Sequence, residues 1–482
     1  MISPAERSWC IEPFTCSDDP GGVVAGLDDR AELAWLDSNP PAGAPASGGF
    51  ARDLLAVDPV AVIEQPAGAD ARLIVDGRVQ ESDPSFWRLW RHVHDRLPRF
   101  EPSPDVLAPG WVGFVGFEAA AQLERLPSPR GDHLALPTAR LALYDSVAVI
   151  DPAARRAAAL TAPGVREVLG LPDDAPPRAS LGSLLKQAGA ARSAPRADAD
   201  GPARIEQLTD GDTYAARVRR ALAYIAAGDI YQVNVSHRVE LTGVGSAISA
   251  YLRARRVNPA PFGALLHWSG GAIASFSPEL MLEVRGDAVR TSPIKGTRRR
   301  TGNESADQAA VRELLASPKE AAELAMIVDL HRNDLGRVCE PGSVEVASPR
   351  RVEAHPTVFH TVADVVGRLR PGCDALDALA ASFPAGSVTG VPKIRALEII
   401  HELEPVPRGA YCGAVGWVGL DGTATFNVGI RTVQFSGDRA VVHGGGGIVA
   451  DSEPHAEYVE TLDKIRGILR GLGADVTPLD TV

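Results

Sequence analysis

Cysteine is scarce in this chain of 482 residues: there are five, they are dispersed, and no Cys-x-x-Cys pair occurs. An odd and scattered set does not form a disulfide framework and is typical of a protein in a reducing cytosol. We therefore expect a cytoplasmic protein. The five are Cys10, Cys16, Cys339, Cys373 and Cys412.

Long apolar runs and an excess of positive charge are also missing. No run is long enough to span a bilayer, and residues 1–7 lack the basic stretch that opens a secretory signal. The formal net charge is −12, which makes nucleic acid a poor partner. We expect neither a membrane nor a nucleic-acid partner, although arginine and lysine can still converge locally on an anionic ligand.

The character of the sequence changes twice along the chain. Short strand-like runs between turn clusters fill the residues before 151, and residues 151–204 are rich in alanine and proline, which is typical of a linker. Helix and strand patterns are clearer in residues 205–475. We expect an N-terminal lobe with its linker over 1–204 and a catalytic domain over 205–475.

Helices and strands do not alternate regularly in the second part. This order favours an antiparallel α+β architecture over a doubly wound parallel sheet. Helices are predicted over 212–227, 306–330, 392–401 and 454–472, and strands over 230–236, 273–300, 410–420, 423–434 and 440–442.

Lys295 lies in a segment whose neighbours restrict the backbone, with Pro293 before it and Gly296 after it. Three arginines, Arg298 to Arg300, follow. Clustered positive charge disfavours a further ammonium and would lower the pKa of this lysine, and only a neutral amine is a nucleophile. The alternative is a solvated basic turn.

Glutamates recur in pairs three residues apart on predicted helices, Glu320 with Glu323 and Glu457 with Glu460. This spacing places both carboxylates of a pair on one helix face. Two such faces turned toward each other would need a hard dication between them, and oxygen ligands completed by water point to Mg²⁺. The alternative, favoured for each pair alone, is a solvated helix face.

Glu279 precedes Lys295 by 16 residues, so neighbouring antiparallel strands could bring the carboxyl group and the amine into one pocket. A carboxyl group beside an amine suits proton transfer to a leaving group, although a plain salt bridge explains the pair equally well.

Four glycines, Gly444 to Gly447, precede the helix that carries Glu457. Their N–H groups could form an anion-binding nest, and the alternative is a flexible loop. No G-x-G-x-x-G occurs, which argues against a dinucleotide-binding fingerprint.

Ordered motifs carry a resemblance to a known family. They are GDIYQV (228–233), SPE (277–279), PIKGT (293–297), MIVDLHRND (326–334), GSVTGVPK (386–393), YCG (411–413), GIRT (429–432) and GGGIVADS (445–452). The chain resembles the chorismate-utilising enzymes, which include component I of anthranilate synthase and of aminodeoxychorismate synthase, with isochorismate and salicylate synthases as relatives. The match is dense over 205–475 and looser before it. The resemblance implies an α+β fold with two large antiparallel β-sheets forming a sandwich and helices packed outside.

The resemblance also implies catalytic and metal-binding roles. Lys295 would add to C2 of the chorismate ring, and Glu279 would protonate the departing C4 hydroxyl and later accept a proton from ammonia. Mg²⁺ would bind the ring carboxylate and neutralise charge as the ring is attacked. Its ligands would be Glu323 and Glu460 directly, with Glu320 and Glu457 behind them.

The resemblance further implies a set of substrate-binding residues. Tyr411 and Arg431 would take the enolpyruvyl carboxylate, because an arginine fork suits a planar carboxylate. His360 and Thr389 can equally be hydrogen-bonded core groups. The remaining candidates are Gly296, Thr297, Gly445, Gly446 and Gly447.

Two positions distinguish activities within the family. Lysine at position 295 is similar to the enzymes that aminate C4, whereas anthranilate synthases, which aminate C2, carry alanine there. Gln232 stands where isochorismate and salicylate synthases carry a lysine that activates water. The resemblance thus implies conversion of chorismate and ammonia to 4-amino-4-deoxychorismate through a covalent lysine adduct, for 4-aminobenzoate and folate biosynthesis. The alternatives are anthranilate synthase component I and a catalytically silent binding subunit.

Two further expectations concern partners and regulation. No Gly-x-Cys-x-Gly elbow of a glutamine amidotransferase occurs, so ammonia would come from a separate amidotransferase subunit, component II, or from solution. Relatives bind tryptophan between Leu-Glu-Ser and Asn-Pro-Ser-Pro-Tyr segments, where this chain has Leu36-Asp37-Ser38 and Asn258-Pro259-Ala260-Pro261-Phe262. These departures leave tryptophan binding open, and we expect a packed core there.

Overall fold

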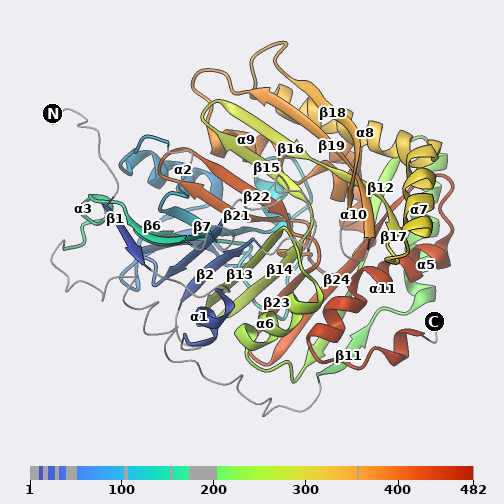
Figure 1. The fold of residues 1–482 in the computed structure, drawn as a ribbon, viewed down its shortest axis with the longest axis horizontal. Coiled ribbons are helices and arrows are strands. Elements are labelled where there is room, and N and C mark those ends of the chain that lie inside the picture. The colour runs from blue at the N-terminus through green and yellow to red at the C-terminus, as the bar shows by residue number, and fades with distance from the viewer. Residues whose placement is uncertain are drawn as a thin grey trace.

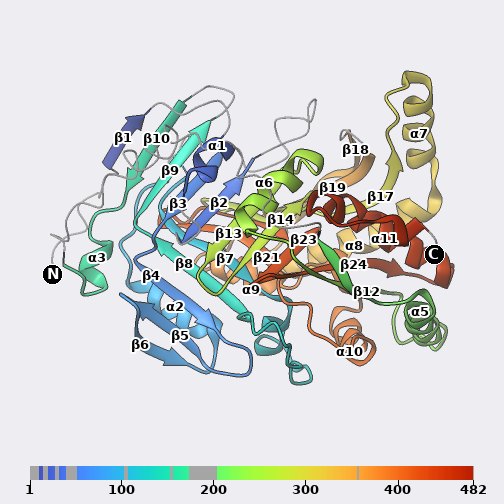
Figure 2. The same cartoon turned by 90° about the horizontal axis from the view of Figure 1, so that it is seen from below.

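Two 12-stranded antiparallel β-sheets form the body of the molecule, with helices outside them (Figures 1 and 2). The α+β sandwich expected from the resemblance is therefore confirmed. The structure is a computed structural model and describes residues 10–14, 20–27, 32–38, 52–102, 107–151, 156–172, 203–354 and 358–480.

The first sheet carries the glycine-rich strand β24, and β20 (Gly390–Val391) pairs with its strand β12. Its strands in spatial order are β1 (Cys10–Phe14), β10 (Arg156–Thr161), β9 (Ser146–Asp151), β3 (Asp53–Val57), β2 (Leu33–Asp37), β13 (Phe262–Trp268), β14 (Gly271–Ser277), β23 (Thr432–Ser436), β24 (Arg439–Ile448), β12 (Gln232–Thr242) and β11 (Arg204–Leu208).

The second sheet carries the lysine-bearing strand β17, and β18 (Glu345–Ala354) pairs with its strand β19. Its strands in spatial order are β17 (Ile294–Arg299), β19 (Val358–Arg368), β16 (Ala288–Ser292), β15 (Leu280–Arg285), β22 (Ala424–Val428), β21 (Ala414–Gly419), β7 (Gly110–Val115), β8 (Ala139–Tyr144), β4 (Ala61–Gln65), β5 (Ala71–Val75) and β6 (Arg78–Asp83).

Helices α7, α8 and α11 gather at the end of the molecule where β17 and β24 lie (Figure 2). Among the described residues no helix combines the length and the apolar character that crossing a membrane requires. The helices are α1 (Gly21–Ala25), α2 (Phe86–Arg96), η1 (Phe117–Gln122), α3 (Val165–Val168), α5 (Gly211–Ala226), α6 (Ala247–Val257), α7 (Glu304–Ala316), α8 (Pro318–Gly336), α9 (Ala375–Ser382), η2 (Gly386–Val388), α10 (Lys393–Leu403), α11 (Pro454–Gly471) and η3 (Thr477–Asp480).

The segments before and after residue 204 share both sheets. Strand β2 pairs with β13 in the first sheet, and β7 pairs with β21 in the second. The expected linker contributes β10, which pairs with β9 and β1, and the short helix α3. Its residues 152–155 and 173–202 lie outside the described residues. The change in sequence character near residue 204 therefore does not coincide with a boundary between the two sheets.

Two local predictions were wrong. The helix expected over 306–330 is two helices, because Ser317 caps α8 by accepting from the backbone N–H of Glu320 at 3.3 Å and Pro318 is the first residue of α8. The glycine run is not a loop: it lies in β24 and pairs with β12. Successive N–H groups of a strand point to alternate sides, so the run does not form a nest.

The two segments compared with the tryptophan-binding pattern lie in a packed core. Tyr251 and Trp35 are fully buried with ring centroids 5.5 Å apart, and Arg255 donates to the two carboxylate oxygens of Asp37 at 2.7 and 2.9 Å. The neighbouring Asp53 is also buried, and burial, together with the charge of Asp37, raises its pKa to about 7. Two buried carboxyl groups therefore lie side by side where β2 meets β3.

Asp53→Asn should make the protein more stable at neutral and alkaline pH. The pKa of Asp53 in the folded state lies above its unfolded value, so folding stability falls as pH rises from about 4 through about 7. We expect the variant to exceed the wild type by about 1–3 kcal/mol at pH 8 in denaturant unfolding, and the difference to shrink toward pH 5. Asp76→Asn, in an exposed turn, is the control. A difference that does not depend on pH would contradict the prediction.

Candidate functional site

Lys295 extends from the second sheet toward the glycine-rich strand of the first. It lies on β17, is half-buried, and its Nζ donates to the carbonyl oxygen of Ser387 at 3.4 Å. A Cβ atom on Gly447 would lie 3.5 Å from Lys295 Nζ and 2.8 Å from Gln232 Nε2. The lysine amine therefore faces β24 and β12 across a gap that only glycine at position 447 leaves open.

The pKa of Lys295 is lowered, as the sequence predicts, but for a different reason. Burial is the main cause and the charge of Lys464 adds to it, while the carboxylates of Glu279, Glu323 and Glu460 act in the opposite direction. The arginines are not among the main causes, and Arg298 pairs with Glu320 at 3.1 Å and with Glu313 at 2.8 Å.

Glu279 lies between β14 and β15 and is buried. Burial raises the pKa of its carboxyl group to about 7, against the opposing effects of the Ser387 hydroxyl, the Lys295 charge and the Ile294 N–H. The N–H of Ile294 lies 3.5 Å from Glu279 Oε1. The structure therefore brings the predicted acid and the predicted nucleophile together, with the acid able to change protonation near neutral pH.

Carboxylates from α8 and α11 meet beside the lysine. Burial raises the pKa of Glu323, and the charges of Glu320 and Glu457 raise it further. Burial also raises the pKa of Glu457, with the charge of Glu460 in the same direction. The Glu457 charge on α11 thus acts on Glu323 of α8, so acidic groups of the two helices lie within electrostatic reach of each other.

Only some of these carboxylates have a positively charged partner. Glu320 is held by Arg298, and Glu460 accepts from Lys464 at 2.8 Å, which lowers the pKa of Glu460. Within the described ranges no three His, Cys, Asp or Glu side chains come close enough to hold a metal ion by themselves. Any cation here would take only one or two protein carboxylates, which is how Mg²⁺ is commonly held beside a substrate anion.

Arg431 is a partly buried guanidinium whose pKa is lowered by burial alone. No ion pair between its guanidinium and an acidic side chain is found in the part of the chain that the structure describes. Its backbone has a positive φ of 51°, a conformation that non-glycine residues rarely adopt. Its carbonyl accepts from Phe276 at 3.0 Å on β14, close to Glu279. A partly buried cation with no acidic partner among the described residues is suited to an anionic ligand.

Tyr411 lies against the glycine run of β24, Gly444 to Gly447. A Cβ atom on Gly445 would lie 2.5 Å from Tyr411 Oη, and one on Gly446 would lie 3.1 Å from Glu457 Oε2. His443 stacks on the Tyr411 ring with centroids 5.1 Å apart. The glycines of β24 thus let Tyr411 and Glu457 approach the strand from its two sides.

The other predicted residues are held by local contacts. Gly296 has a φ of 79°, so its backbone conformation alone accounts for a glycine at this position, without contact to a ligand. Thr297 is exposed, and its hydroxyl lies 3.0 Å from His360 Nδ1. The Thr389 hydroxyl donates to the carbonyls of Ala385 and Gly386.

Sequence reasoning missed three groups that the structure places near Lys295 or near the glutamates of α8 and α11. Lys464 follows Glu460 by four residues, a spacing that could have indicated a helical ion pair. Lys319 influences the pKa of Glu323, Glu457 and Glu460. Ser387 lies in a motif segment but only the fold brings its carbonyl to the lysine.

The fold and this site bring together, as in an enzyme, an amine and a carboxyl group of raised pKa beside a cation suited to a carboxylate. The family model for chorismate binding enzymes matches residues 46–470, and the chain belongs to this family.

Named relatives carry two different activities. An anthranilate synthase component 1 of Streptomyces coelicolor is 42% identical over 75% of this chain and 72% of its own length. An aminodeoxychorismate synthase component 1 of Salmonella typhimurium is 37% identical over 78% of this chain and 80% of its own. The crystal structure of anthranilate synthase component I from Streptococcus pneumoniae superimposes with a TM-score of 0.74 and 30% identity, covering 86% of this chain and 92% of that one.

Proposed function

We propose that the chain is component I of an aminodeoxychorismate synthase, which converts chorismate and ammonia to 4-amino-4-deoxychorismate and water for 4-aminobenzoate and folate biosynthesis. One observation carries the proposal: the Lys295 amine has a lowered pKa and lies beside Glu279 and the glycine run of β24. An alanine at position 295 would leave this site without a nucleophile.

In the first step the neutral amine of Lys295 forms a bond to C2 of the ring. Both double bonds of the ring diene shift, C1=C2 to C1=C6 and C5=C6 to C4=C5, and the C4–O bond breaks, while Glu279 gives its proton to the departing hydroxyl, which leaves as water. Burial supports this role because it keeps a fraction of the Glu279 carboxyl groups protonated near pH 7.

In the second step ammonia forms a bond to C4, both double bonds shift back, and the C2–N bond to Lys295 breaks. Glu279, now ionised, accepts the proton that ammonia loses, so the acid and the amine return to their starting states. The net change replaces the C4 hydroxyl with an amino group and releases one water.

The acidic groups of α8 and α11 fit a magnesium ion. Glu323 and Glu460 would hold it directly, with Glu320 and Glu457 behind them; burial, with a smaller effect of neighbouring carboxylates, raises the pKa of Glu323 and Glu457, and a bound cation would oppose both effects. When bound, Mg²⁺ neutralises the ring carboxylate and so makes the ring easier to attack.

Arg431→Met should weaken chorismate binding. The guanidinium would be the partner of the enolpyruvyl carboxylate, together with the Tyr411 hydroxyl, so its loss removes a charge-assisted contact. We expect KM for chorismate to rise about 100-fold with a smaller change in kcat. Arg395→Met, which removes an arginine paired at the surface with Asp229 and Glu398, is the control and should leave KM unchanged. Equal KM values for the two variants would contradict the assignment.

The product identifies the activity. Chorismate, Mg²⁺ and ammonium chloride should give 4-amino-4-deoxychorismate by mass spectrometry, with no anthranilate fluorescence. Anthranilate synthase component I is the second candidate because relatives with that name reach 42% identity. Anthranilate formed without any added lyase would establish it instead. The ammonia would come from an amidotransferase subunit, which the "component 1" in the relatives' names supports.

A further inference from the structure

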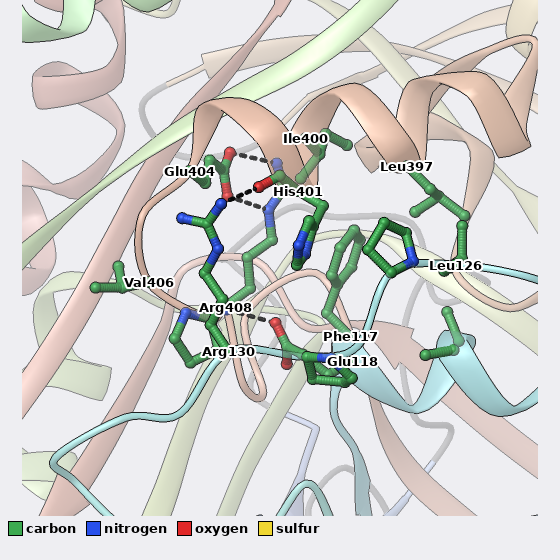
Figure 3. A pocket seen from close by; sticks show the side chains of 15 residues that line it. Phe117, Glu118, Leu126, Arg130, Leu397, Ile400, His401, Glu404, Val406 and Arg408 are labelled. Atoms are coloured by element: carbon green, nitrogen blue, oxygen red, sulfur yellow. Dashed lines mark hydrogen bonds and ion pairs between the residues drawn. The ribbon is translucent and has the colours of Figure 1, made fainter. Parts of the chain in front are cut away.

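The short helical turn η2 is held at its C-terminal end by buried groups of the surrounding fold. Arg408 donates to the carbonyl of Val388 at 3.0 Å, and its guanidinium is itself held by Glu404 at 2.7 and 2.8 Å (Figure 3). The carbonyl of the next residue, Thr389, accepts from the backbone N–H of Asn234 on β12 at 2.7 Å. The turn is therefore fixed both to the first sheet and to the end of α10.

Helix α8 supports the same turn from a second element. A Cβ atom on Gly386 would lie 2.7 Å from Leu330 Cδ2 and 3.1 Å from His331 Cδ2, so the helix packs directly against η2. The His331 ring is in turn fixed by the Thr291 hydroxyl, which lies 2.8 Å from Nδ1. Ser387, the central residue of η2, is thus held through both of its neighbours.

Ser387 lies beside both the predicted nucleophile and the predicted acid. Its carbonyl accepts from Lys295 Nζ at 3.4 Å. Its hydroxyl oxygen is buried and has no hydrogen-bond partner of normal geometry within the described residues, yet it acts on Glu279 and lowers the pKa of that carboxyl group. Buried hydroxyls rarely stay unpaired, and a hydroxyl hydrogen can rotate toward a neighbouring carboxyl group once that group becomes a charged acceptor.

Other groups near Glu279 have smaller effects or none on its charge. Of the influences that lower its pKa, the Ser387 hydroxyl is the largest, ahead of the Lys295 charge on β17 and a backbone N–H. His331 on α8 stays neutral, because burial lowers its pKa to about 3. The Arg431 guanidinium is not among the groups that shift the pKa of Glu279. The Ser387 hydroxyl is therefore the side-chain donor best placed to stabilise the ionised carboxylate.

We propose that Ser387 is a positioning residue that holds the amine through its carbonyl and donates its hydroxyl to Glu279 whenever that carboxyl group is ionised. This inference rests on the proposed amination of chorismate and adds a residue that adjusts the balance between its two steps. The hydrogen bond favours the carboxylate, which accepts a proton from ammonia, over the acid, which protonates the departing hydroxyl. Loss of the hydroxyl should therefore affect the two steps in opposite directions near neutral pH.

The test removes the hydroxyl and follows each step separately. Ser387→Ala keeps the carbonyl that meets Lys295, and the lost hydroxyl makes no hydrogen bond that the fold needs. Adduct formation is measured without ammonia from the mass of the Lys295 peptide, over a range of pH around 7, and the adduct is then released with ammonium chloride. Ser387→Thr keeps a hydroxyl. Ser382→Ala is the matched control, because it removes another buried and unpartnered serine hydroxyl, at the end of α9.

In Ser387→Ala the fall in adduct formation should move upward by about one pH unit from its wild-type position near pH 7, and release by ammonia at pH 7 should slow about fivefold. Ser387→Thr and Ser382→Ala should keep the wild-type values.

Three results would overturn the role of the hydroxyl: an unmoved fall in Ser387→Ala, an equal slowing of both steps at every pH, or the same shift in Ser382→Ala. A wild-type protein that forms no adduct would instead refute the proposed function, so the two failures are distinguishable.

Discussion

Lys295→Ala is expected to abolish formation of 4-amino-4-deoxychorismate. Without the amine no covalent bond to C2 can form, and Glu279 alone cannot replace a nucleophile. We expect a loss of at least about 1000-fold in kcat, measured as product formed from chorismate and ammonium chloride by mass spectrometry.

Two further measurements separate this chemical loss from a loss of binding or folding. Lys295→Arg places a permanently charged guanidinium at this position, which is not a nucleophile, and it should be as inactive as the alanine variant. Chorismate binding measured by titration calorimetry should persist in both, since the binding groups are elsewhere. Normal turnover by Lys295→Ala would show that amination proceeds without the lysine adduct.

Glu279→Gln is expected to lower kcat by about 100- to 10,000-fold, because the departing hydroxyl would lose its acid and the incoming ammonia its base. The Glu279 carboxyl has a pKa raised by burial to about 7, so its protonated form is lost as pH rises through that value. The rate of adduct formation without ammonia should therefore fall through about pH 7 in the wild type, and this limb should be absent from the residual activity of the variant.

The control for Glu279 lies on the following strand. Glu283 pairs with Arg285 at 3.0 Å and Arg290 at 2.9 Å, away from Lys295, and Glu283→Gln should keep the wild-type pH profile. If the Glu279→Gln variant still shows the fall in rate through about pH 7, the ionisation that causes this fall belongs to another group.

Much of the site was visible in the sequence because its residues sit in short motifs whose order fixes the family. Glu279 and Lys295 come together because β15 and β16 form a hairpin in which Leu280 pairs with Ser292, three residues before Lys295 on β17. The paired glutamates follow from helical spacing. Contacts between distant segments were not visible. Lys464 at Glu460, and the Ser387 carbonyl at Lys295, depend on how α11 and η2 pack onto the sheets.

The errors have local physical causes. Composition suggested that neighbouring arginines depress the pKa of Lys295. In the structure Arg298 is paired with Glu313 and Glu320, and burial is the main cause of the lowered pKa of Lys295. A glycine run resembles a loop when read alone, yet Gly444 to Gly447 continue β24 because pairing with β12 satisfies their backbone, and their missing side chains leave room for the ligand.

The most direct test of the central claim is peptide mass mapping of the wild-type protein after incubation with chorismate and Mg²⁺ but no ammonia. The mechanism predicts that the peptide containing Lys295 gains the mass of chorismate less one water, and that adding ammonium chloride removes the modification as product appears. A protein that forms 4-amino-4-deoxychorismate while this peptide stays unmodified at every time point would contradict the account.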